Sequence, residues 1–390
     1  MATRSENRFV RHRKKTVVVI LILAFLLIEL CSNVVIRLKG HQELRKRYPL
    51  NRIVSGYTVY RNTPHYDFSL WTIRGLPDEP DAQLDAHGFL SDSPVSVAKP
   101  DGVVRVFLLG GSAAFSAGQT DAYGAVHKYP WGVHVYRRSI AGYLKQYLSQ
   151  AFPSRRFEVI TAAAYERKFH QSFLSYLEVI SRFSPDYVVN MEGWNDVSSI
   201  VSGTPYHDAE SQLEDCIALW NRHFEKPLMQ RTGTYYVLSK LIDRAKRISP
   251  EVRAETSTCD PVNFAQEAYL DHRAEYVANA GRFLQILRQY SATVQADDVK
   301  MVFVLQPMLL RKGCNKRLST IEQALAEVVP FQRQSPELTA RSMQVARYFF
   351  DDYLADAMAE TLAGNAEFID MNEEIEELGR HSRCTRTIAT

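Results

Sequence analysis

The chain has 390 residues, enough for one large domain or two ordinary ones, and its 46% hydrophobic and 23% charged content is that of a globular protein with a substantial core. The net charge of +3 hides a division: residues 1–47 carry 11 Lys/Arg against three Glu, whereas the remainder carries 36 basic and 41 acidic residues. The basic excess therefore belongs to the N-terminus. The main domain has no electrostatic footprint for nucleic acid, and we expect no such partner.

An apolar stretch near the N-terminus, Thr16–Ile36, is long enough to span a bilayer, for which about 20 residues suffice. A cleaved signal peptide is the alternative, but the apolar run is long and no small-x-small site precedes Arg37. We therefore predict an uncleaved anchor. The dense basic tail at 1–15 favours a cytoplasmic N-terminus, which makes this a single-pass protein of the inner (cytoplasmic) membrane with a periplasmic C-terminal domain.

One carboxylate, Glu29, falls inside the predicted span. A charge at the centre of a bilayer is costly, and intramembrane carboxylates usually face a partner or hold a proton. The sequence leaves two interpretations open: a membrane partner near Glu29, or a position close enough to the far interface to reach water.

After the anchor, a polar, proline-rich segment at 37–100 is typical of a stalk and an irregular lead-in. Beyond it, apolar runs alternate with segments of helical periodicity, which predicts a parallel sheet covered on both faces. We assign 101–378 to this α/β domain, with an insertion at about 197–260 and a short tail at 379–390. The predicted strands are Val103–Leu109, Phe157–Thr161, Tyr187–Met191, Met301–Gln306 and Glu367–Asp370. The predicted helices are Tyr136–Gln150, Phe169–Phe183, one from Asp260 to about Tyr290, and one from Ser335 to Gly364.

Three strand ends carry residues suited to chemistry. The first strand ends in Gly110-Gly111-Ser112, the second runs into the small-residue turn Ala162–Tyr165, and the third into a loop, Glu192–Asp196. The carboxyl ends of parallel strands lie at one edge of the sheet, so these segments should meet. By itself, the Gly-Gly-Ser turn has three possible interpretations: a loop that binds phosphate, a turn that presents a nucleophilic serine, or a tight connection without a function. We expect Asp196 to hold its own loop together by hydrogen bonds.

Taken together, these motifs resemble those of the SGNH (GDSL-type) hydrolase superfamily, in particular its membrane-anchored bacterial members, over roughly Asp85 to Asp370. The resemblance implies a flavodoxin-like three-layer α/β/α sandwich with a parallel sheet of about five strands. It also implies that Ser112 is the nucleophile and that Asn195 donates to the oxyanion. The backbone N–H of Ala163 would take the place of a glycine N–H. The matching segments are His87-Gly88-Phe89, Lys99-Pro100-Asp101-Gly102, Gly110-Gly111-Ser112 and Gly193-x-Asn195-Asp196.

In this family the general base comes from an Asp-x-x-His block shortly after the last strand. This sequence contains no such block. None of the 11 histidines has an Asp three residues before it, and the sequence closes with GRHSRCTRTIAT. Three explanations compete: a truncated or frame-shifted C-terminus, which we place first; His381 acting as base; or a protein that works without hydrolytic chemistry. A serine without a base is a weak nucleophile, so this departure weighs on the enzyme prediction.

The expected function is a serine esterase or acyl-transfer protein, needing no cofactor, that acts on O-acyl esters, O-acetyl above all, of cell-surface glycans. The alternative is a catalytically inactive SGNH-like domain that binds or scaffolds in a polysaccharide export or modification system. A third interpretation, a flavodoxin-like mononucleotide binder, leaves Gly193–Asp196 unexplained. Cys259 and Cys314 lie in polar, turn-like segments, and either a disulfide between them or two free thiols is compatible with the sequence.

Overall fold

The computed structural model divides the chain into two compact units, one of residues 1–51 with 220–252 and one of 52–219 with 253–390. The residues that it describes are 13–38, 52–55, 58–66, 83–115, 135–165, 167–201, 217, 232–248, 263–306, 345–346, 348–371 and 373–374.

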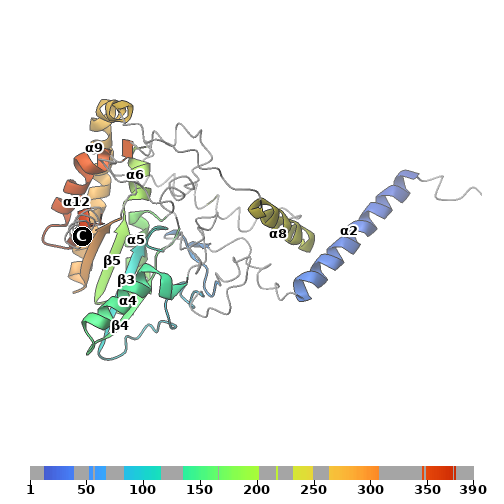
Figure 1. The fold of residues 1–390 in the computed structure, drawn as a ribbon, viewed down its shortest axis with the longest axis horizontal. Helices are drawn as coiled ribbons and strands as arrows, with labels where there is room; N and C mark the ends of the chain where they lie inside the picture. The colour runs from blue at the N-terminus through green and yellow to red at the C-terminus, as the bar shows by residue number, and fades with distance from the viewer. Residues whose placement is uncertain are drawn as a thin grey trace, which may run out of the picture. The chain divides into compact units, whose positions relative to one another are not determined.

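The larger unit is built on a five-stranded sheet in which every neighbouring pair is parallel. Its spatial order is β4-β3-β5-β6-β7, which is the doubly wound 2-1-3-4-5 order of flavodoxin-like folds. Figure 1 labels β4, β3 and β5 of this sheet. The predicted fold class is confirmed, and each strand begins and ends within one residue of its expected position. The strands are β3 (Val103–Gly110), β4 (Arg156–Thr161), β5 (Tyr187–Glu192), β6 (Lys300–Leu305) and β7 (Glu367–Asp370).

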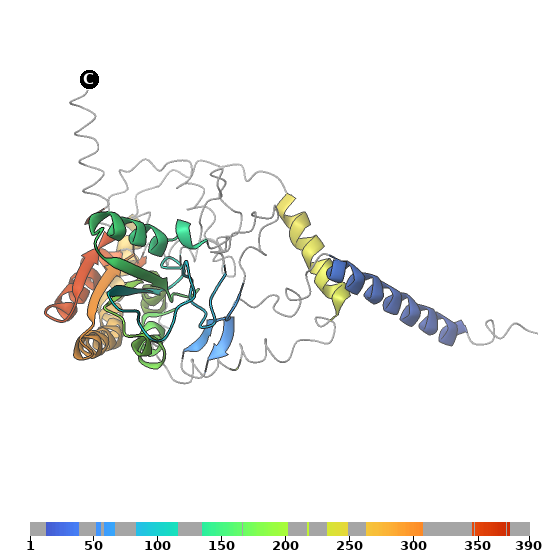
Figure 2. The ribbon, with the colours of Figure 1, turned by 90° about the horizontal axis from the view of Figure 1, so that it is seen from below.

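Helices cover both faces of this sheet (Figure 2). Along β3, Phe107 and Leu109 enter one hydrophobic cluster while Val106 and Leu108 enter the other, because successive side chains of a strand point to opposite faces. This explains why the strand reads as a continuous apolar run. One cluster lies under α4 (Ile140–Ala151). The other lies under α5 (Phe169–Glu178), α6 (Trp194–Val201), α9 (Asn263–Ala296) and α12 (Ala355–Leu362).

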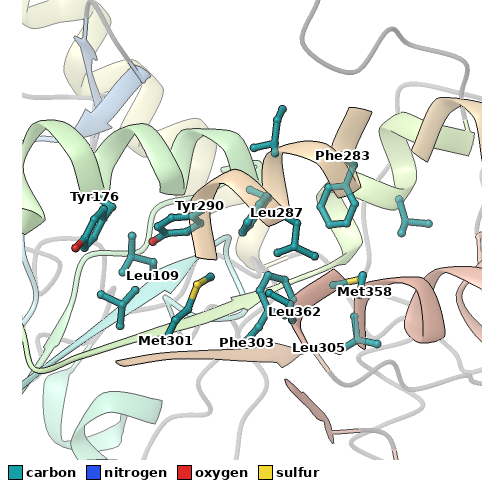
Figure 3. Packing of buried hydrophobic residues seen from close by; sticks show 14 of the residues in the cluster. Leu109, Tyr176, Phe283, Leu287, Tyr290, Met301, Phe303, Leu305, Met358 and Leu362 are labelled. Carbon is teal, nitrogen blue, oxygen red and sulfur yellow. The ribbon is translucent and has the colours of Figure 1, made fainter. Parts of the chain in front are cut away.

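The long helix α9 supplies much of the second cluster. Figure 3 shows Phe283, Leu287 and Tyr290 of α9 packed over Leu109, Met301 and Phe303 of the strands. All three of these α9 side chains are fully buried. The carboxyl ends of β3 and β5 therefore project from a rigid, closely packed layer.

Three predicted helices differ in detail from those observed. Tyr136–Gln150 is a short 3₁₀ turn followed by α4, because the Ser139 hydroxyl accepts the Gly142 N–H (3.1 Å) and caps a new helix start. The helix predicted from Phe169 continues past α5 only as a 3₁₀ segment, Ile180–Phe183. A π-helical segment, Phe350–Leu354, precedes α12, and α12 ends just before Gly364, as predicted.

Part of the predicted stalk belongs to the larger unit. Strands β1 (Arg52–Ser55) and β2 (Val59–Asn62) form an antiparallel hairpin. Side-chain hydrogen bonds connect this hairpin to the rest of the larger unit. Gln171 Nε2 donates to the Thr58 carbonyl (3.1 Å), and Asn62 Nδ2 donates to the carbonyls of Gly88 (3.2 Å) and Ala163 (2.8 Å).

The smaller unit contains two described helices, α2 (Arg13–Leu38) and α8 (Gly233–Ile248). Within α2, Lys15–Leu38 has a mean hydropathy of 2.7 and is almost entirely exposed in the structure. By length and composition this segment is a candidate membrane span, and it coincides with the predicted anchor.

Candidate functional site

Ser112 lies in the turn that follows β3, with its side chain partly exposed. Strand β3 lies between β4 and β5, and the chain order of the strands reverses at β3 and β5. In open α/β sheets, ligands bind in the crevice outside the carboxyl ends of the strands at such a switch point. The serine selected from the sequence is therefore at the position where this fold places its sites.

The Gly110-Gly111 pair permits a close approach of Asn195. A Cβ placed on Gly111 would lie 2.5 Å from Asn195 Nδ2, so the amide nitrogen occupies the space that any side chain would need. Gly110 has φ +140°, a backbone conformation that favours glycine. The amide also donates to the Arg167 carbonyl (2.9 Å), which uses one of its two N–H groups.

The segment after β5 differs from the predicted loop. Only Gly193 separates β5 from α6, so Asn195 and Asp196 lie in the first turn of a helix. The helix forms because Val197 and Ile200 enter the core and are fully buried. Asp196 Oδ1 accepts the backbone N–H of Phe169 (3.0 Å), and the carboxylate thereby joins α6 to the start of α5.

Ala163 is fully buried just after β4. Its carbonyl accepts a hydrogen bond from Asn62 Nδ2 (2.8 Å), and the N–H of the next residue, Ala164, donates to the Gly110 carbonyl (3.0 Å). Within the described ranges, the Ala163 N–H has no hydrogen-bond acceptor. The three residues selected from the sequence thus come from segments that meet around the Gly110–Ser112 turn.

A buried carboxylate, Glu192, lies next to this turn, and the sequence predicted no role for it. Glu192, at the end of β5, accepts hydrogen bonds from the Ser172 hydroxyl (2.6 Å) and from the Gly111 N–H. Burial, and next the negative charge of Asp196, raise the pKa of the Glu192 carboxyl well above its ordinary value, and the opposing effects of Ser172, Arg167 and Gly111 only partly offset this. Through these hydrogen bonds, Glu192 at the end of β5 is joined to the backbone that follows β3 and to Ser172 of α5.

The Ser112 hydroxyl makes no hydrogen bond in the part of the chain that the structure describes. No general base for Ser112 is therefore found among the described residues. His381, Cys259 and Cys314, like the whole tail at 379–390, lie outside the described residues. No group of three His, Cys, Asp or Glu side chains that could hold a metal ion occurs among the described residues.

The arrangement offers a partly exposed hydroxyl, a side-chain amide with one N–H to spare, and a nearby backbone N–H. Such donors can stabilise negative charge that develops on a carbonyl oxygen under attack. A hydroxyl and hydrogen-bond donors are therefore grouped at the carboxyl edge of the sheet.

Two contributing residues, Asn62 and Glu192, were missed in the sequence. Asn62 lies 101 positions before its partner Ala163, in a segment without strand periodicity. Glu192 did carry a local signal, because an acidic residue that directly continues the apolar run YVVNM is placed in the sheet, where a carboxylate needs partners.

The sequence matches no protein-family model and no curated protein. Among solved structures, the chain is similar to LAE5, an α/β hydrolase enzyme from the metagenome of Lake Arreo, Spain (14% identity, 71% of this chain and 81% of that one, TM-score 0.31). It is also similar to Axe2, an acetylxylan esterase from Geobacillus stearothermophilus (13% identity, 70% and 80%, TM-score 0.28). Similarity of this degree assigns no activity and no site residue to the chain.

Proposed function

We propose that this protein is a membrane-anchored serine esterase or acyl-transfer protein of SGNH type. The observation that carries the proposal is the close approach of the Asn195 amide to Gly111, the residue before Ser112, at the switch point of a flavodoxin-like sheet. In the proposed reaction, Ser112 attacks an ester carbonyl. The Asn195 amide and the N–H groups of Ser112 and Ala163 hold the oxyanion.

The proposed substrate is an O-acyl group, O-acetyl above all, on a cell-surface glycan outside the cytoplasmic membrane. The resemblance of the sequence motifs to those of membrane-anchored SGNH hydrolases supports this choice. The basic tail at the start of the chain supports a cytoplasmic N-terminus, and we propose on this basis that the larger unit is periplasmic.

Labelling with a fluorophosphonate tests the activity, because the reagent requires a serine that a base has activated. The full-length protein in detergent would be compared with Ser112→Ala and with Ser181→Ala, a partly exposed serine in the 3₁₀ segment after α5. We expect labelling of the unmodified chain and of Ser181→Ala, and none of Ser112→Ala.

If the unmodified chain does not react although its circular dichroism is that of a folded protein, the esterase proposal fails. A domain that binds acylated glycans without turnover would then be the remaining function. Where labelling succeeds, release of acetate from an O-acetylated polysaccharide by the unmodified chain and not by Ser112→Ala tests the substrate class.

A further inference from the structure

Helix α2 lies against α8 in the smaller unit (Figures 1 and 2). Glu29, Ser32, Asn33 and Ile36 follow the i, i+3, i+4, i+7 spacing of a single helix face. Ser32 and Ile36 are buried, and Glu29 and Asn33 are half-buried, whereas the other side chains from Val17 to Leu38 are exposed. This face of α2 is therefore a contact surface for α8.

The contact is made by the carboxylate of Glu29 at the N-terminus of α8. Glu29 Oε1 accepts the Gly233 N–H (2.7 Å), and Oε2 accepts both the N–H and the hydroxyl of Thr234 (2.8 Å each). Asn33 Nδ2 donates to Oε1 (2.8 Å). The first N–H groups of a helix lack intrahelical acceptors, and the positive end of the helix dipole favours an anion there.

Close packing accompanies these hydrogen bonds. A Cβ on Gly233 would lie 3.0 Å from Asn33 Nδ2, so glycine lets the two helices approach, as small residues do between membrane helices. One turn further on, Tyr236 is buried with Ile36 in a cluster of their own.

The position of Glu29 along α2 fixes where α8 begins. Glu29 is nine residues before Leu38, about 13 Å along the axis at 1.5 Å per residue. If the 24-residue stretch Lys15–Leu38 is centred on a hydrocarbon layer about 30 Å thick, Glu29 lies about 10 Å inside that layer. A carboxylate at that depth needs partners, and Gly233 and Thr234 of α8 supply them.

The side of α8 that faces away from α2 is apolar and exposed. Leu238, Leu241 and Ile242 are 53%, 57% and 44% exposed, and Tyr235, one turn earlier, is 39% exposed. The exposed side chains from Val17 to Ile28 of α2 are apolar as well. The second half of the α8 sequence contains Lys240, Arg244, Lys246 and Arg247 against one acidic residue, Asp243, which suits anionic lipid headgroups.

We infer that α8 is a second membrane-embedded element of this protein, in contact with lipid and not with another protein. It begins in the hydrocarbon at the depth of Glu29, contacts acyl chains through Leu238, Leu241 and Ile242, and leaves the membrane through its basic half. With 16 residues, about 24 Å, it enters the bilayer without crossing it. The inference rests on the proposed membrane anchor but not on the esterase activity.

Spin labels on the full-length protein in lipid nanodiscs with anionic phospholipid test this inference. In a chain whose five native cysteines are replaced by serine, single labels would be introduced by Leu238→Cys and Leu241→Cys. Leu23→Cys in α2 reports on the anchor, and Tyr147→Cys, 67% exposed on α4, reports on the other unit. Collision rates with oxygen, which concentrates in lipid, are compared with those of a water-soluble nickel chelate.

We expect the labels at 238 and 241 to resemble the label at 23, with an oxygen-to-nickel collision ratio several-fold above that at 147. A ratio at 238 and 241 equal to that at 147, with 23 still in lipid, would overturn the inference and leave the anchor intact. If the label at 23 is exposed to water as well, α2 is not in the membrane, and both the anchor and this inference are wrong. Protection of 238 and 241 from both reagents would mean that a protein or a second copy covers α8, which also overturns it.

A further variant tests the role of Glu29. Glu29→Gln places an amide NH₂ against N–H donors of α8, and we expect it to lower the collision ratio at 238 several-fold while that at 23 stays unchanged. An unchanged ratio at both positions would show that the Glu29 carboxylate does not hold α8 in the membrane.

Discussion

The side-chain amide of Asn195 occupies the space above the Cα of Gly111, so that a Cβ at position 111 would lie 2.5 Å from Nδ2. This contact joins the turn after β3 to the first turn of α6, and it places a hydrogen-bond donor against Gly111, the residue before Ser112. The observed position of the Asn195 amide therefore requires that residue 111 has no side chain.

Gly111→Ala should therefore displace Asn195. We expect a loss of about 1–3 kcal/mol in the free energy of unfolding, as for other overpacked positions. We also expect at least a tenfold loss of esterase turnover. Gly281→Ala is the matched control, because a Cβ at this exposed position of α9 meets nothing within 4 Å. It should raise stability by up to about 1 kcal/mol. Thermal unfolding in detergent that leaves both variants equally stable would contradict this account.

Asn195→Ala removes the proposed oxyanion donor. We expect kcat for a chromogenic acetate ester to fall by about 10²–10³, with a much smaller change in KM, because the donor acts on charge that develops in the transition state. Asn279→Ala removes an amide that donates to the Ile200 carbonyl (3.3 Å) in the same unit, and kcat should be unchanged. Equal effects of the two substitutions would indicate general destabilisation.

The strands and their ends were predictable because their signals are local. The apolar run of β3 followed by Gly110 shows a buried strand and a sharp turn within ten residues, and β5 with Gly193 shows the same. The contact of Asn62 with Ala163 joins segments 101 residues apart and leaves no local pattern. The start of α6 was misread as a loop because Gly193 suggests a turn, while the burial of Val197 that stabilises the helix is a tertiary effect.

The hydrogen-bond network around Glu192 could not be predicted from the sequence either. The raised pKa of Glu192 depends first on its burial and next on Asp196, four residues on, while Ser172, twenty residues before it, supplies a hydrogen bond. Only the folded sheet brings these groups together.

The raised pKa of Glu192 predicts a pH dependence of stability. Below the ordinary carboxyl pKa of about 4.5, both folded and unfolded chains hold the proton. Above it only the folded chain holds the proton, so the contribution of Glu192 to stability falls as the pH rises through the window up to its raised pKa.

Glu192→Gln, which mimics the protonated side chain, should remove this dependence. We expect the stability of Glu192→Gln relative to the unmodified chain to increase from pH 4.5 upward in denaturant titrations. Glu178→Gln, the same replacement at an exposed position at the end of α5, is the control for the chemical change itself. A difference between the unmodified chain and Glu192→Gln that is constant over this range would contradict the assignment.

At the opposite end of β3, a fully buried guanidinium holds the strand in place. Arg105 Nε donates to Glu158 Oε2 (2.7 Å), and Nη1 donates to the Phe183 carbonyl (2.7 Å). Glu158→Ala would leave the buried charge without its carboxylate. Because the Glu158 side chain is 28% exposed, we expect a cost of about 2 kcal/mol, below the 3–5 kcal/mol typical of fully buried pairs.

Adding Arg105→Met to Glu158→Ala should recover part of this loss, since an apolar side chain of similar length needs no counter-ion. The control is Asp92→Ala, which breaks the more exposed pair of Asp92 with Lys145 and should change stability by less than about 1 kcal/mol. The measurement is the denaturant midpoint of unfolding of the unmodified chain, Glu158→Ala, the double variant and Asp92→Ala. If the double variant is less stable than Glu158→Ala alone, the cost comes from lost packing around Arg105 and not from its uncompensated charge.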